Sequence, residues 1–168
     1  MPKQVKFVDF EIPNTRAFFN LIALPNVREF EATPNVHSAL NAAWALWHIC
    51  EWRWHELGTA EKLSDFRQRV CALCPELQQL RDITDAAKHR GVSRDSHGVK
   101  KVSTASGRGG AGGWNVPSGG YGVGAVAWGS GEPELRVVFD DDSAQWLPEI
   151  IKAATDFWSR TLIGTAAA

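Results

Sequence analysis

The sequence predicts a mostly helical α+β fold: a four- to five-helix bundle with a small antiparallel β-sheet inserted before the C-terminal helix. Apolar residues recur at helical spacing in the first 92 residues and again after residue 141. Glycines concentrate in residues 103–132, where no helical period is present. A chain of 168 residues is long enough for one hydrophobic core. A composition of 44% hydrophobic and 22% charged residues is typical of a soluble globular protein.

We therefore expect a single domain over residues 1–168. It divides into a helical bundle (1–92), a glycine-rich β-hairpin region (93–140) and a C-terminal helix (141–168). No internal repeat at a fixed period is present, so a repeat architecture is not expected.

Turn-forming residues place the ends of the first two helices. The first helix is expected over residues 15–24, because Pro25 breaks it, and the sequence NVREFEA then adds a short helical turn. The second helix is expected to start at Thr33, which can accept hydrogen bonds from the free amides of the first turn. Pro34 then occupies the first helical position, where its missing N–H costs nothing. The second helix continues until Gly58 ends it.

Similar signals place the third and fourth helices. Thr59 can cap the third helix, which is expected to end near Cys71. Pro75 opens the fourth helix, PELQQLRDITDAAKHR, and Gly91 closes it.

The remaining elements are strands and one last helix. Two strand-like segments, residues 123–128 and 134–140, are separated by a turn that contains glycine and proline. This pattern predicts a β-hairpin. Residues 99–103 supply a third strand. The final helix is expected to begin near Ser143 and to pack back on the bundle.

The second helix is apolar around most of its circumference and keeps one polar stripe. Its apolar side holds Val36, Leu40, Ala43, Trp47, Cys50 and Trp54. Six other residues fall within an arc of about 80° on a helical wheel: His37, Asn41, Trp44, His48, Glu51 and His55. This pattern predicts a central helix whose stripe faces water, a ligand or the side chains of another helix.

Charge and cysteine content narrow the class of protein. A formal net charge of -1 gives no overall positive field for holding duplex nucleic acid. The first ten residues lack the apolar segment of a secretory signal, and no apolar run reaches the ~20 residues that span a bilayer. The three cysteines, Cys50, Cys71 and Cys74, are read as small buried side chains. We therefore expect a cytoplasmic protein without membrane association, cofactor or bound metal.

Two other interpretations of the polar stripe stay open. His48 and Glu51, one turn apart, could share a metal ion, but a closed site needs ligands from other helices and no HExxH signature is present. Alternatively, His48 and Glu51 form a buried pair with basic residues of the fourth helix and specify how the two helices dock.

The fourth helix carries its own polar border. Arg81, Asp85 and Lys88 lie along one edge of its apolar face, where they could meet the polar stripe of the second helix. Lys88, His89 and Arg90 also stand in the last turn, where cations complement the negative end of the helix dipole without any further function.

A family resemblance rests on the segments WHICEW, CPEL and RDITDAAKH, which follow one another in this order. They resemble segments of small bacterial helical proteins and, more distantly, the layout is similar to the HEPN superfamily over about residues 35–92. HEPN proteins are helical bundles, among them metal-independent ribonucleases of toxin–antitoxin and phage-defence systems. Many contain an Arg, about four to six residues and then a His, whereas seven residues separate Arg81 from His89 here.

The resemblance implies roles for particular residues. Arg81 would stabilise the phosphate and His89 would act as the acid/base, while Glu51 or Asp85 would orient a histidine. The expected catalytic residues are His48, Glu51, Arg81, Asp85 and His89. The expected RNA-binding residues are Lys88, Arg90, Lys100 and Lys101.

Three functions follow from these patterns. The first is a HEPN-like, metal-independent ribonuclease of the toxin or defence type, with a polar site between the second and fourth helices. The second is a non-catalytic HEPN-like module for binding or assembly, whose partner is a protein encoded nearby or a second copy of the chain. The third is a metal-dependent hydrolase. The expected partners are RNA, a protein encoded nearby and further copies of the chain in a homo-oligomer.

Overall fold

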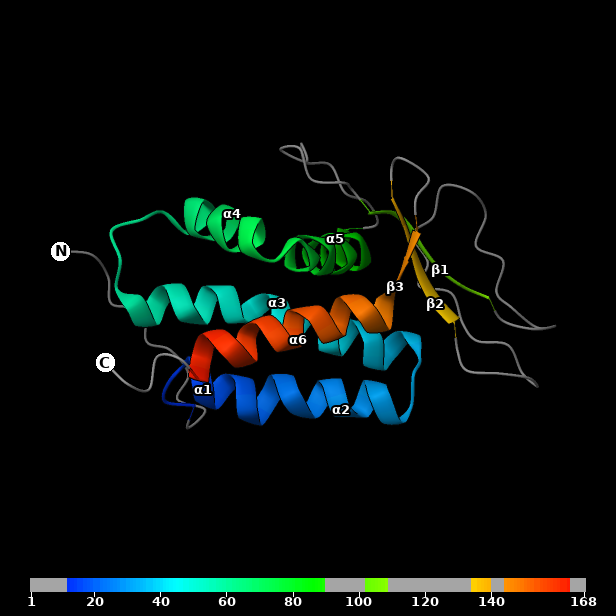
Figure 1. The fold of residues 1–168 in the computed structure, drawn as a ribbon, viewed down its shortest axis with the longest axis horizontal. Helices are drawn as coiled ribbons and strands as arrows, with labels where there is room; N and C mark the ends of the chain where they lie inside the picture. Colours follow the sequence, from blue (N-terminus) through cyan, green and yellow to red (C-terminus); the bar gives the residue numbers. More distant parts are fainter. Residues whose placement is uncertain (1–11, 90–101, 109–133, 140–143, 164–168) are drawn as a thin grey trace.

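The computed structural model describes residues 12–89, 102–108, 134–139 and 144–163, and within these residues the chain is mostly helical, as expected (Figure 1). The helical elements are α1 (Thr15–Phe18), the π-helical turn η1 (Phe19–Ala23), α2 (Leu24–Ala32), α3 (Val36–Leu57), α4 (Leu63–Leu73), α5 (Pro75–His89) and α6 (Leu147–Ile163). The strands are β1 (Val102–Arg108), β2 (Glu134–Phe139) and β3 (Ala144–Trp146).

The first helix does not break at Pro25, so that expectation is wrong. The helix passes from α1 through η1 into α2, and in η1 the N–H of Leu24 bonds to the backbone oxygen of Phe19, five residues earlier. Pro25 then stands in the first turn of α2, where its missing N–H is tolerated. The side-chain amide of Asn26 donates to the oxygen of Ile22 at 2.8 Å, which gives a partner to a carbonyl of the π-helical turn before the proline.

The start of α3 lies at Val36 and not at the expected Thr33. Asn35 caps this helix: its side-chain oxygen accepts from the N–H of Ser38 at 3.0 Å, and Ser38 Oγ accepts from the N–H of Asn35 at 3.2 Å. This reciprocal pair satisfies two donors of the first turn, so it replaces the cap expected from Thr33, which instead ends α2. The other end is as expected, because Gly58 closes α3 with a φ of 56°.

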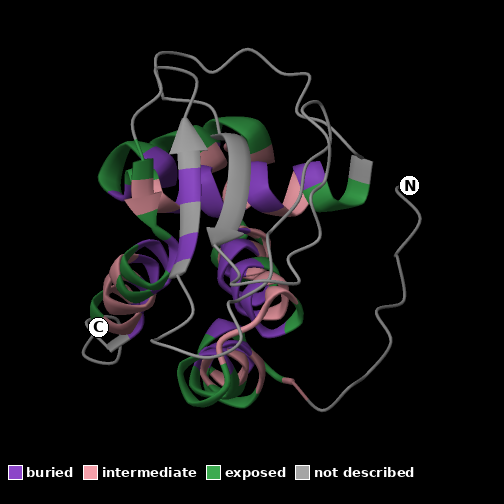
Figure 2. Cartoon of the chain, turned by 90° about the vertical axis from the view of Figure 1, so that its right-hand side faces the viewer, coloured by how far each residue is buried: buried purple, intermediate pink, exposed green. Residues whose placement is uncertain are grey.

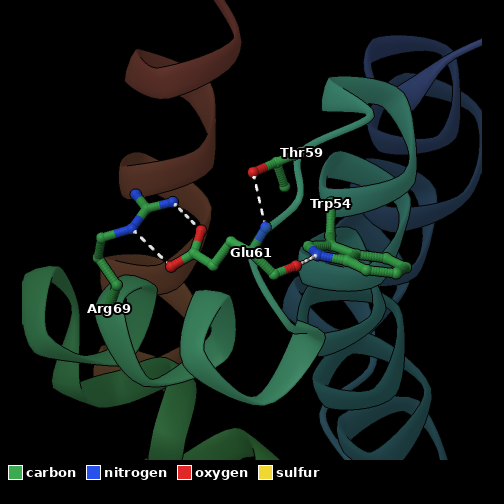
Figure 3. Close-up of polar contacts among 4 residues, drawn as sticks. All are labelled: Trp54, Thr59, Glu61 and Arg69. Carbon is green, nitrogen blue, oxygen red and sulfur yellow. Dashed lines mark hydrogen bonds and ion pairs between the residues drawn. The ribbon is translucent and has the colours of Figure 1, made fainter.

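The connection between α3 and α4 is organised by Glu61 (Figure 3). Its N–H donates to Thr59 Oγ1 at 3.1 Å, and its backbone oxygen accepts from Trp54 Nε1 at 2.7 Å. Its carboxylate accepts two hydrogen bonds from Arg69, at 2.8 and 3.3 Å. Thr59 therefore stabilises this turn, and α4 starts at Leu63, later than the cap expected at Thr59.

The start of α5 agrees with the sequence-based expectation, whereas the start of α6 does not. α5 begins at Pro75, as its proline predicts, whereas Gly91 lies outside the described residues. α6 begins at Leu147 and not near Ser143, because the residues before it form β3. Gln145 and its two neighbours pair with β2, and the apolar helical repeat begins only after them.

The described strands lie in the order β1-β2-β3, with β2 antiparallel to both neighbours. Leu135 and Val137 of β2 are buried and join the core of the helices. β1 overlaps the expected strand at residues 99–103 and continues to Arg108. Residues 123–128 lie outside the described part of the chain, so the hairpin that they were expected to form with 134–140 stays a prediction.

α3 is the central helix, as its apolar circumference predicts. It packs against α2, α5 and α6, and Figure 2 shows the buried residues on the sides of the helices that face one another. Its buried alanines, Ala39, Ala42, Ala43 and Ala45, let neighbouring helices approach closely. None of the helices in the described ranges is long and apolar enough to cross a bilayer.

Candidate functional site

A groove with a volume of about 530 Å³ lies between α3 and α5. From α3 it is lined by Leu40, Asn41, Trp44, Trp47 and His48. From α5 it is lined by Arg81, Thr84, Asp85, Ala87 and Lys88, and Arg67 of α4 completes the lining. These spacings of three, four and seven residues place each set on one side of its helix, so the groove follows the seam between two amphipathic faces.

His48 is held in a defined orientation by its own helix. Its Nδ1 lies 2.9 Å from the backbone oxygen of Trp44, one turn earlier. A carbonyl oxygen can only accept, so Nδ1 carries the proton of this hydrogen bond. In the neutral imidazole, Nε2 on the other side of the ring therefore keeps its lone pair and is available to a ligand.

Trp47 forms a nearly buried base for two arginines. The guanidinium carbon of Arg67 lies 5.3 Å from the centre of the Trp47 ring, and that of Arg81 lies 5.5 Å from it. Both distances are within the range of cation–π attraction, which holds the two positive groups near one another despite their repulsion. The arginines thus bring two guanidinium groups, from α4 and α5, to a single groove.

Each of these arginines also meets a carboxylate, over a long distance. Arg67 Nη2 lies 3.4 Å from Glu51 Oε2, and Arg81 Nε lies 3.4 Å from Asp85 Oδ2. All four side chains are partly exposed, so each ion pair contributes at most about 1 kcal/mol. The Nε of Arg67 is buried and makes no hydrogen bond within the described residues. These arginines can therefore turn toward a bound anion at low cost.

The groove is locally positive in a chain that is slightly negative overall. Arg67, Arg81 and Lys88 outnumber Asp85 among its lining residues, whereas the formal net charge of the whole chain is -1. A concave surface that gathers cations raises the local concentration of anionic ligands. A phosphate group is one ligand that fits this charge and these donors.

The structure brings together four of the expected catalytic and RNA-binding residues, because His48, Arg81, Asp85 and Lys88 all line the groove. Glu51 stands beside the groove and reaches it through Arg67. The backbone of His89 ends α5, and its side chain is outside the described atoms. The RNA-binding candidates Arg90, Lys100 and Lys101 also lie outside the described residues.

His48 is oriented by its own helix and not by a carboxylate, whereas the role expected for Glu51 or Asp85 beside His89 stays a prediction, because the side chain of His89 is not described. Glu51 pairs with Arg67 and Asp85 pairs with Arg81, while the backbone oxygen of Trp44 positions the imidazole. The spacing explains this result, since a histidine ring reaches the carbonyl of the preceding turn of its own helix without help from α5.

Arg67 was missed by reasoning from the sequence. It stands on α4 next to the buried Phe66 and four residues before the buried Cys71, so it belongs to the inward border of that helix. This pattern marks Arg67 as a border cation. The sequence alone does not indicate that α4 packs where Arg67 reaches Trp47.

The three cysteines are buried and form no disulfide, as expected for structural thiols. Burial and the carboxylate of Glu76 raise the pKa of the Cys74 thiol to about 12. Burial and the neighbouring Cys71 raise the pKa of Cys50 far above the ordinary value of a thiol. In the described parts of the chain, no group of three or more His, Cys, Asp and Glu side chains is arranged to hold a metal ion.

Comparison with family models, with curated proteins and with solved structures gives no match in any of the three.

Proposed function

We propose that the groove between α3 and α5 binds RNA and cleaves its backbone without a metal ion. The observation that carries the proposal is that His48, with Nε2 available, lines the same groove as Arg67, Arg81 and Lys88. A proton acceptor beside several cations is the arrangement that phosphodiester transesterification needs. The distant likeness to HEPN ribonucleases supports the same class of reaction.

In this reaction His48 Nε2 takes the proton of a ribose 2′-hydroxyl, and the 2′ oxygen attacks the adjacent phosphorus. The bond from phosphorus to the 5′ oxygen breaks, and that oxygen leaves with a proton from water. The products are a 2′,3′-cyclic phosphate and a 5′-hydroxyl end. Arg81 and Arg67 stabilise the negative charge that develops on the phosphate oxygens, and Lys88 attracts the neighbouring phosphate.

A second candidate function is RNA binding without cleavage. Among the described residues the groove is lined by one histidine, whereas general acid–base cleavage is fastest when two groups share the proton transfers. The cations and Trp44 are sufficient for binding on their own. This candidate keeps the non-catalytic role of the HEPN-like module expected from the sequence, with RNA in place of a protein partner.

RNA cleavage by purified protein in excess chelator separates the two candidates. The variant His48→Asn keeps an amide nitrogen near the position of Nδ1, so it can still bond to the Trp44 oxygen while Nε2 is lost. We expect cleavage by the native chain and a decrease of about 10²- to 10⁴-fold in this variant. His55→Ala, an exposed histidine of α3 outside the groove, is the matched control and should retain full activity.

The outcome also distinguishes the biological role. Intact RNA after incubation with the folded native chain, together with measurable RNA binding, would replace cleavage by the binding function. Equal cleavage by His48→Asn and the native chain would remove His48 from the mechanism. A toxin-type role further predicts that expression slows bacterial growth and that His48→Asn relieves this effect.

A further inference from the structure

Trp44 is a large aromatic side chain that the fold leaves half exposed. Its exposed fraction is 50%, although it stands in the middle of the central helix and its neighbours Ala43 and Ala45 are fully buried. Exposing so much indole surface forgoes the stabilisation that its burial would bring. Trp44 lines the groove that holds the cations. An exposed aromatic surface in this position is the kind that a flat ligand covers.

The ring of Trp44 is stacked at an angle on that of His48. The ring centroids are 4.2 Å apart and the planes are inclined by 32°, so one side of the indole is partly covered by the imidazole. The hydrogen bond from His48 Nδ1 to the backbone oxygen of Trp44 fixes the imidazole, and the indole lies against this fixed ring. This contact limits the freedom of the indole, so less conformational entropy is lost when a ligand stacks on it.

We infer that the groove takes an unpaired nucleobase, stacked on Trp44, with its phosphate on Arg81 and Lys88, so that the substrate is single-stranded RNA. This inference rests on the proposed function for the identity of the ligand. Aromatic side chains combined with a positive groove are how proteins hold single strands without reading their sequence. A volume of about 530 Å³ is within the usual range for a site that holds a ligand of nucleotide size.

The geometry disfavours a duplex for a simple reason. Bases in an A-form duplex are stacked on their neighbours and paired, so none can lie flat on Trp44 unless it is unpaired first. A single strand can turn one base into the groove while its phosphates stay beside the cations of α5. Asn41 and Thr84, which line the groove from opposite helices, supply polar groups for the edge of that base.

Binding can be measured separately from cleavage with a 2′-O-methyl oligoribonucleotide, which has no free 2′-hydroxyl to attack. With 2-aminopurine as one of its bases, the oligonucleotide also reports stacking, because the fluorescence of this base falls when it stacks. We expect quenching with the native chain and with Trp44→Phe, which keeps an aromatic ring. Trp44→Leu should abolish the quenching and weaken binding by roughly tenfold or more.

Two competitors test whether the stacked base belongs to a single strand of RNA. A duplex of the same sequence should compete at least about tenfold less well than the single strand, because its bases are not available for stacking. A mononucleotide offers one base and one phosphate, so it should also compete less well than the strand. Equal competition by the duplex would overturn the inference, and equal competition by the mononucleotide would overturn the assignment to RNA.

The inference and the proposed function fail in different ways. Quenching that depends on Trp44, with no cleavage of unmodified RNA, would sustain the inference and overturn the proposed catalysis. Cleavage and binding that are both unchanged in Trp44→Leu would overturn the inference and leave the catalysis in place. The circular dichroism and melting temperature of Trp44→Leu and Trp44→Phe provide the folding control, and Trp44→Phe alone shows whether an aromatic ring restores binding.

Discussion

The indole Nε1 of Trp158 donates a hydrogen bond of 3.0 Å to the backbone oxygen of Leu46. This bond joins the middle of α6 to the middle of α3, between residues that are 112 positions apart in the chain. Both residues are almost completely buried, so water cannot replace the bond if the indole nitrogen is removed. The C-terminal helix is thus an integral part of the core that supports the groove.

Replacing Trp158 tests this joint. Trp158→Phe should lower the free energy of unfolding by about 1 to 3 kcal/mol, since it removes the hydrogen bond and part of the buried ring. Trp158→Ala should cost about 3 to 5 kcal/mol. Urea unfolding followed by circular dichroism measures both values. Trp44→Phe, at a half-exposed position, is the control and should change the stability by less than about 1 kcal/mol; a loss as large as that of Trp158→Phe would contradict this picture of the core.

The charge of Arg81 leads to a prediction about how RNA binding depends on salt concentration. For single strands the logarithm of the binding constant falls with the logarithm of the salt concentration, with a slope of about -0.7 for each phosphate that is neutralised. Arg81→Gln should therefore weaken RNA binding and make the slope less steep by about 0.7. Titrations of a labelled oligonucleotide at several salt concentrations give this slope.

The control for Arg81→Gln is Arg28→Gln, which removes the same charge from an exposed position on α2. We expect Arg28→Gln to leave the slope almost unchanged, because the residue does not line the groove. Equal effects of the two substitutions would show that binding depends on the total charge of the chain and not on this groove.

Removing the charge of Glu51 should strengthen RNA binding, whereas removing that of Arg81 should weaken it. Its carboxylate lies 3.4 Å from Arg67 and competes with a bound phosphate for that guanidinium. Because an exposed ion pair of this kind contributes at most about 1 kcal/mol, Glu51→Gln should strengthen RNA binding by about two- to fivefold at low salt. Titration of the same oligonucleotide measures the change.

Glu29→Gln, an exposed carboxylate of α2, is the matched control for the change in net charge. It should alter binding less than Glu51→Gln does. Weaker binding by Glu51→Gln would instead mean that Glu51 holds Arg67 in its working position.

The burial of the cysteines leads to a prediction about how fast their thiols react. The pKa of Cys74 is raised from an ordinary value of 9.0 to about 12, so its thiol stays protonated in the folded chain at pH 8. Thiol reagents attack the thiolate, and they should therefore label the native chain slowly and the unfolded chain fast. Rapid labelling of any of the three cysteines in native buffer would contradict their buried placement.

The same shift affects stability. Above pH 9 the thiol loses its proton in the unfolded chain and keeps it in the folded chain, so the free energy of unfolding falls as the pH rises from about 9 toward 12. Cys74→Ala should make this decrease smaller, which melting curves at a series of pH values can measure. An equally steep decrease in the variant would assign it to other groups.

Local rules predicted those features of the fold that local chemistry decides. Gly58 ends α3 and Pro75 starts α5 as expected, because each position requires a backbone conformation that its residue favours. The rule that proline breaks a helix failed at Pro25, where a π-helical turn absorbs the missing donor. A capping box at Asn35 likewise replaced the simpler cap expected at Thr33.

The candidate site divides in the same way. Helical spacing was enough to place His48 on a polar stripe and Arg81 on a polar border, since both follow from the period of one helix. The presence of Arg67 in the groove depends on how α4 packs against α3, which no single-helix pattern contains. The hydrogen bond of His48 to a carbonyl of its own helix was not expected from the sequence either.

Glu61 has no atom in the groove, yet its bonds to Thr59, Trp54 and Arg69 hold the turn that aligns α4 with α3. The alignment of α4 in turn sets where Arg67 meets Trp47. A genetic screen for chains that fold but no longer hold their ligand would therefore recover lesions in this turn, remote from any atom that the ligand touches.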